Sequence, residues 1–83
     1  MVNVEAKKKY LRKLTLEATN KMVLVCLSDT EQETRVEFRR FRDIAIRSTD
    51  RTEYKMAVVQ AYLHLQSLTF AQILELAESI SDN

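Results

Sequence analysis

Six arginines between residues 35 and 51 are the side chains best suited to bind phosphates. They are Arg35, Arg39, Arg40, Arg42, Arg47 and Arg51. A guanidinium group binds phosphate bidentately, so several arginines on one helix can follow a nucleic-acid backbone. Within the predicted helix, Arg42 alone lacks an acidic residue three or four positions away. If this segment binds phosphates or an acidic partner, the expected contacts are Arg35, Arg39 and Arg42.

Acidic residues in the same segment give these arginines a competing structural role. Side chains three or four residues apart are neighbours on a helix and can form ion pairs. The expected pairs are Glu31–Arg35, Glu37–Arg40, Arg39–Asp43 and Asp43–Arg47. The isoelectric point of the chain is about 7.9, whereas nucleic-acid-binding domains typically exceed about 9. A solvated, self-paired helix face is therefore the preferred interpretation, and nucleic-acid binding is the alternative.

A second basic segment lies near the N-terminus. It consists of Lys7, Lys8, Lys9, Arg12 and Lys13, and residues 1–13 carry a net charge of +4. Such a segment attracts phosphates or an acidic protein surface and raises the encounter rate more than the affinity. Lys8 and Arg12 are the expected contacts. The competing ion pairs along one helix are Glu5–Lys9 and Lys13–Glu17.

His64 and Cys26 are the remaining candidates for catalytic or metal-binding chemistry. His64 falls on the polar stripe of a predicted helix, and Cys26 lies within an apolar run, so we expect a surface histidine and a buried, inert thiol. The chain also has no glycine, which phosphate-binding loops, dinucleotide-binding turns and nucleophile elbows require. We therefore expect no enzymatic activity, no catalytic or metal-binding residues, no cofactor and no small-molecule substrate.

The absence of both Gly and Pro also favours an all-α fold. Tight hairpin turns need glycine, whereas polar side chains can cap helices. Asn3 can cap a first helix through Leu14 and beyond. Three overlapping capping patterns in Ser28–Thr30 then predict a second helix from about Glu31 to Arg47. We predict a bundle of three to four helices in a single domain, residues 1–83, and we expect dimerisation to complete this bundle.

Capping patterns also divide the C-terminal half of the chain. Asp50 with Glu53 predicts the start of a third helix, and Thr69 with Gln72 predicts a fourth. Alternatively, the third helix continues unbroken through Thr69. The expected inward-facing residues include Val4, Leu14, Ala18, Met22, Phe38, Phe41, Ile44, Ala45, Ala57, Val58, Ala61, Leu65, Ile73 and Ala77.

An α+β fold is the alternative, with a short N-terminal meander around residues 14–40. Residues 14–18 and 34–38 alternate between apolar and polar side chains, as strands do. Between them, residues 22–27 are all apolar, which is typical of a buried strand.

The C-terminal third of the chain is more apolar than one packed helix face requires. Residues 56–83 contain 16 apolar residues and no Lys or Arg. A chain of this length buries only about 60–65 % of its unfolded surface, so a second chain would add stability. We predict a homodimer or another protein partner. The expected interface residues are Met56, Val59, Tyr62, Leu63, Phe70, Ile73, Leu76 and Ile80.

Location and function follow from these features as expectations. The first nine residues lack the apolar stretch of a signal peptide. The uncharged stretch of residues 56–74 contains too many polar side chains to favour a membrane span. We predict a cytoplasmic, non-membrane adaptor or regulatory protein that acts through protein–protein interaction. The alternative is a nucleic-acid-binding regulator that uses residues 35–51 and 7–13.

Overall fold

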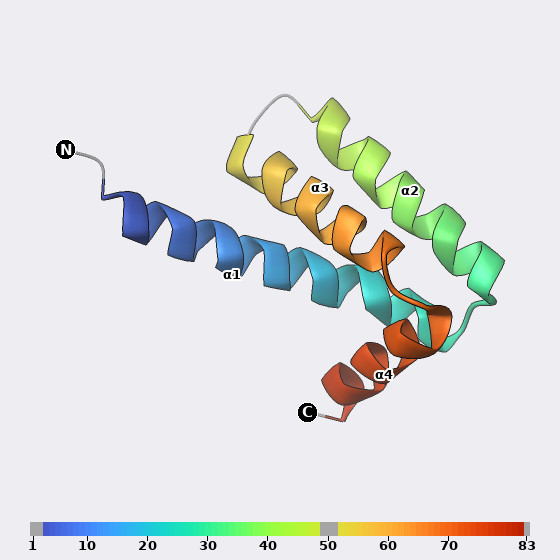
Figure 1. The fold of residues 1–83 in the computed structure, drawn as a ribbon. Coiled ribbons are helices and arrows are strands. Elements are labelled where there is room, and N and C mark those ends of the chain that lie inside the picture. The colour runs from blue at the N-terminus through green and yellow to red at the C-terminus, as the bar shows by residue number, and fades with distance from the viewer. Residues whose placement is uncertain (1–2, 49–51, 83) are drawn as a thin grey trace.

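The computed structural model describes residues 3–48 and 52–82, which form four α-helices and one short 3-10 helix (Figure 1). In chain order these are α1 (Val4–Val23), η1 (Leu24–Leu27), α2 (Glu31–Arg47), α3 (Thr52–Gln66) and α4 (Phe70–Ser81). No strand occurs in these two ranges. The all-α prediction is therefore confirmed, and the alternative of a meander over residues 14–40 is wrong.

The first two helices begin at polar caps. The Asn3 Oδ1 atom accepts hydrogen bonds from the backbone N–H groups of Glu5 (3.1 Å) and Ala6 (3.2 Å). At the start of α2, Thr30 Oγ1 accepts from the Glu33 N–H (3.2 Å), and Glu33 Oε1 accepts from the Thr30 N–H (3.0 Å). These bonds satisfy N–H groups that have no partner within the helix. The Thr30–Glu33 pattern is thus the one of the three that forms a capping box.

A second capping box separates α3 from α4. Thr69 Oγ1 accepts from the Gln72 N–H (3.2 Å), and Gln72 Oε1 accepts from the Thr69 N–H (2.9 Å). Since α3 ends at Gln66, the alternative of one helix continuing through Thr69 is wrong. The predicted Asp50–Glu53 box lies outside the described residues.

The apolar run of residues 22–27 spans the end of α1 and all of η1. Met22, Val23 and Cys26 are buried. The segment lies where η1 contacts both α2 and α4. Leu24 and Leu27 of the same run are 40 % and 46 % exposed, so packing explains only part of this apolar run, which is helical and not a strand.

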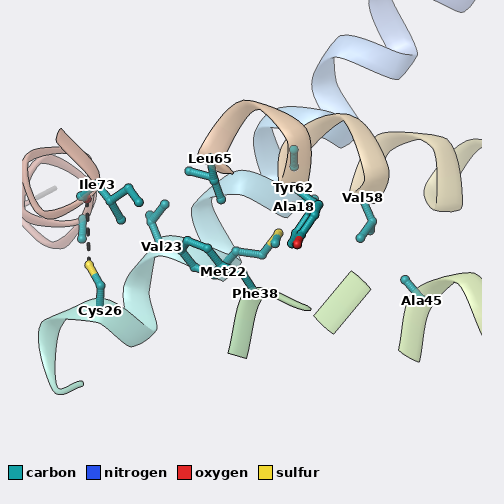
Figure 2. Packing of buried hydrophobic residues seen from close by; sticks show 12 residues of the cluster. Ala18, Met22, Val23, Cys26, Phe38, Ala45, Val58, Tyr62, Leu65 and Ile73 are labelled. Atoms are coloured by element: carbon teal, nitrogen blue, oxygen red, sulfur yellow. Dashed lines mark hydrogen bonds between the residues drawn. The ribbon is translucent and has the colours of Figure 1, made fainter. Parts of the chain in front are cut away.

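The core forms where α3 lies between α1 and α2 and where α4 covers the η1 end (Figure 1). Figure 2 shows Phe38 of α2, Leu65 of α3 and Met22 of α1 meeting in its centre, with Ile73 of α4 beside Val23. These large side chains are almost completely buried. In this arrangement, one side of α1 faces the space between α3 and α4.

The predicted inward faces are correct for most residues, with two corrections. The Ile44 side chain is 63 % exposed and Val4 is 59 % exposed, so neither belongs to the core. At 3.6 residues per turn, Ile44 lies roughly 80° from the stripe that Thr34, Phe38 and Ala45 form on α2. Val4 is exposed because it lies in the first turn of α1, where residues 3–10 are all exposed.

Candidate functional site

An apolar groove of about 670 Å³ opens between α1, α3 and α4. All three helices contribute apolar side chains to its lining. These are Leu11 and Leu16 from α1, Met56 and Ala57 from α3, and Leu76 and Ile80 from α4. The part of α1 that faces the groove consists of Leu11, Arg12, Thr15, Leu16, Thr19 and Asn20.

Several large apolar side chains of this lining are exposed. The exposed fraction is 61 % for Leu16, 51 % for Met56 and 36 % for Leu76. Apolar residues scattered singly over a surface are ordinary, whereas a contiguous apolar patch marks an interaction site. Because these three residues line one groove, they form such a patch.

Two threonines of the lining have their hydroxyl groups occupied within α1. Thr15 Oγ1 donates to the Leu11 carbonyl at 2.7 Å, and Thr19 Oγ1 donates to the Thr15 carbonyl at 2.8 Å. This is a common way for a mid-helix hydroxyl to satisfy its donor. The α1 side of the groove therefore offers little free hydrogen-bonding capacity between Arg12 and Asn20.

The histidine does not form a catalytic pair. His64 is exposed at the edge of the groove and shares a smaller pocket, of about 340 Å³, with Glu75. No hydrogen bond or ion pair joins these two residues in the described part of the chain. Across residues 3–48 and 52–82, no three His, Cys, Asp or Glu side chains cluster as metal ligands would. None of the helices in these ranges has the length and apolarity that crossing a bilayer requires.

The single cysteine is part of the core. Cys26 is buried, and its Sγ donates to the Ile73 carbonyl oxygen at 3.9 Å (Figure 2). Burial raises the pKa of the thiol, because the thiolate is poorly solvated there. The reactive thiolate form is therefore disfavoured, in agreement with the prediction of an inert thiol.

Two arginines of α2 are held by groups of the protein itself. Arg35 Nη1 donates to the Leu65 carbonyl at 3.2 Å, and Arg35 Nη2 donates to the Leu68 carbonyl at 3.0 Å. Its predicted ion pair with Glu31 forms at 4.0 Å. The predicted pair of Arg40 with Glu37 also forms, at 3.8 Å.

Arg42 has partners that its helical spacing did not reveal. Its Nε and Nη2 atoms donate to Asp43 Oδ1 at 3.1 and 2.9 Å. The guanidinium carbon lies 4.6 Å from the centre of the Tyr62 ring, in cation–π geometry. Asp43 is occupied in this way, and its predicted pairs with Arg39 and Arg47 do not form among the described residues.

Other arginines of this segment are more exposed to solvent. Arg39 and Arg47 are exposed on α2, and Arg51 lies outside the described residues. The guanidinium groups of Arg35 and Arg42, two of the three expected phosphate contacts, are thus engaged by the protein. Arg39 is the one that remains solvated.

The N-terminal half of α1 carries basic charge that no ion pair among residues 3–48 and 52–82 neutralises. Residues 3–10 are exposed, and Figure 1 shows α1 extending past the beginning of α3. The predicted pairs of Glu5 with Lys9 and of Lys13 with Glu17 do not form in the described part of the chain. Of the two predicted contacts here, Lys8 is exposed, and Arg12 is exposed and lines the groove.

The predicted interface residues occupy four different settings. Met56, Leu76 and Ile80 line the groove. Leu63 is 57 % exposed elsewhere on α3. Val59 and Phe70 are half-buried, while Tyr62 and Ile73 are buried in the core of the chain itself.

We did not predict from the sequence that α1 contributes apolar side chains to the groove. Leu14, Ala18 and Met22 form the buried stripe of this helix. Leu16 lies two residues after Leu14 and therefore off that stripe. An apolar residue outside the buried stripe was the one available indication that α1 has a second apolar face.

Comparison of the chain with protein-family models, with curated proteins and with solved structures finds no match. The groove and the charges around it are therefore the features from which a function can be inferred.

Proposed function

We propose that this chain is a non-enzymatic interaction module, an adaptor or regulator that binds an apolar helical segment in the groove between α1, α3 and α4. The observation that carries the proposal is the exposure of Leu16, Met56 and Leu76 along one groove. Grooves between helices are recurrent receptors for amphipathic helices. A cytoplasmic location, where Cys26 would stay reduced, belongs to the same proposal.

Covering the groove would stabilise a complex through the hydrophobic effect. Burying a fully exposed large aliphatic side chain contributes about 1.5–3 kcal/mol. Leu16 and Met56 are each more than half exposed, so each can contribute roughly half of that amount or more. The groove therefore has the apolar surface that an interface centre needs.

Nucleic-acid binding remains the alternative function, and the Lys7–Lys13 segment is what supports it. The contacts of Arg35 and Arg42 disfavour phosphate binding by the arginines. Phosphate would have to replace the carbonyl oxygens, carboxylate and aromatic ring that these two side chains already contact. The two functions differ in salt dependence, because phosphate contacts weaken steeply as salt rises whereas apolar contacts do not.

A photo-crosslinking amino acid placed in the groove tests the proposal directly. We expect the crosslinker at position 16 or 56 to give a protein adduct in the cells from which the chain comes. Val36 and Ile44 are exposed apolar residues of α2 outside the groove and serve as matched control positions. We expect no adduct from them.

Two results would overturn the proposal. One is the absence of any protein adduct, self or foreign, from positions 16 and 56. The other is tight binding of a duplex or single-stranded oligonucleotide that falls steeply with salt and is abolished by Lys8→Ala/Arg12→Ala. The second result would establish the nucleic-acid alternative.

A further inference from the structure

The groove is flanked by two helices of opposite charge. On one side lies the basic N-terminal half of α1, with Lys8, Lys9 and Arg12. On the other side lies α4, whose exposed Glu75 lines a smaller pocket together with the groove residue Leu76. No Lys or Arg occurs in residues 56–83, so nothing on α4 offsets its negative charge.

The two charged helices open toward the same side of the molecule. Figure 1 shows α1 and α4 diverging from the η1 end, so that the N-terminus of α1 and the C-terminus of α4 point in a similar direction. A two-fold axis on that side places a second copy so that its α1 faces the first copy's α4 and its α4 faces the first copy's α1. The positive helix of each copy then meets the negative helix of the other.

We infer that the occupant of the groove is a second copy of this chain. The inference rests on the proposed function and names its partner. In this homodimer, Lys8 and Arg12 of each copy lie along Glu75 of the other. Leu16, Met56 and Leu76 of the two copies cover one another between these charged edges.

The exposed start of α1 supports this arrangement independently. Val4–Tyr10 forms about two helical turns whose side chains are all exposed within the chain. This segment is the capped start of the 20-residue helix α1, and it makes its hydrogen bonds along that helix while its side chains lie unpacked within the chain. The α4 surface of a second copy provides that packing, and the aliphatic stems of the lysines can lie along it.

Charge reversal on each helix tests the reciprocal contact. We expect the purified chain to sediment at twice its monomer mass of 9.7 kDa at micromolar concentration. Lys8→Glu/Arg12→Glu should weaken dimerisation on the order of tenfold or more, because attraction becomes repulsion at both symmetric contacts. Glu75→Lys should weaken it as well. Circular dichroism confirms that each variant remains helical.

A mixture of the two variants is the decisive arm of the experiment. In the mixed dimer both contacts again join opposite charges, so an equimolar mixture should recover the wild-type association. The matched control is Arg39→Glu/Arg47→Glu, which makes the same change of net charge on exposed positions of α2 outside the groove. We expect this variant to dimerise like the wild type.

The outcomes separate this inference from the proposed function. A wild-type chain that stays monomeric, or variants that do not recover association when mixed, overturns the reciprocal homodimer. If position 16 then still gives an adduct to a different protein, the groove is an interaction site with a foreign occupant and the proposed function stands. If position 16 gives no adduct of either kind, both proposals fail.

Discussion

The Nη2 atom of Arg35 lies 3.0 Å from the carbonyl oxygen of Leu68, in the connection between α3 and α4. A second bond, from Nη1 to the Leu65 carbonyl, ties the same side chain to the end of α3. The last carbonyl groups of a helix have no partner within it, so a cation there supplies both hydrogen bonds and favourable charge. Arg35 thereby links α2 to the point where the chain turns into α4.

Removal of Arg35 should destabilise the fold. Hydrogen bonds to a charged group contribute about 1.5–3 kcal/mol, so Arg35→Ala should lower the free energy of unfolding by about that amount in urea titrations. Arg39→Ala is the matched control, because Arg39 is exposed on the same helix, and it should change stability by less than about 0.5 kcal/mol. Equal effects of the two substitutions would show that the contacts of Arg35 do not matter for stability.

The contact between Arg42 and Tyr62 should be measurable as a coupling energy. The Tyr62 hydroxyl accepts a hydrogen bond from Gln66 Nε2, and the ring is buried beneath the guanidinium group. A double-mutant cycle of Arg42→Ala and Tyr62→Leu should give about 0.5–1 kcal/mol. The same cycle with Arg40→Ala should be additive, and additivity in the Arg42 cycle would exclude the cation–π contact.

Thr34→Val should leave stability unchanged or raise it by about 1 kcal/mol. Thr34 is completely buried, and its Oγ1 has no hydrogen-bond partner among the described residues. Valine has nearly the same shape and removes the unsatisfied hydroxyl. Thr30→Val is the opposite case, because that hydroxyl caps α2, and it should lower stability by about 1 kcal/mol. A clear loss from Thr34→Val in thermal unfolding would mean that its hydroxyl is bonded.

The buried thiol should make stability depend on alkaline pH. Burial raises the pKa of Cys26 in the folded chain, so the folded state keeps this proton to higher pH than the unfolded state does. The contribution of the Cys26 thiol to the free energy of unfolding is therefore complete below the ordinary thiol pKa of about 8.5. This contribution is lost as pH rises from there through the pKa of the folded state.

Two measurements check this effect. The unfolding free energy of the wild type should fall more steeply above about pH 8.5 than that of Cys26→Ala, which lacks the thiol but retains every other titrating group. A thiol reagent should modify Cys26 slowly in buffer and rapidly in urea. Rapid modification of the folded chain would contradict the burial.

The helix boundaries were predictable because capping is local. Asn3, the Thr30–Glu33 box and the Thr69–Gln72 box each act on backbone groups within three residues. The predicted second helix, Glu31–Arg47, therefore agrees with α2. The strand-like pattern of residues 14–40 was misleading because Met22, Val23 and Cys26 are buried against helices and not within a sheet.

The sequence by itself determined that the chain is helical, where its helices begin, and that the net charge is positive before residue 56 and negative after it. Only the tertiary structure decided that Arg35 and Arg42 are bound by the protein, and that Leu16 joins Met56 and Leu76 in one groove. The physical reason is the separation along the chain over which each interaction acts. Caps and ion-pair spacing act within one helical turn, whereas burial and groove formation depend on which helices pack together far along the chain.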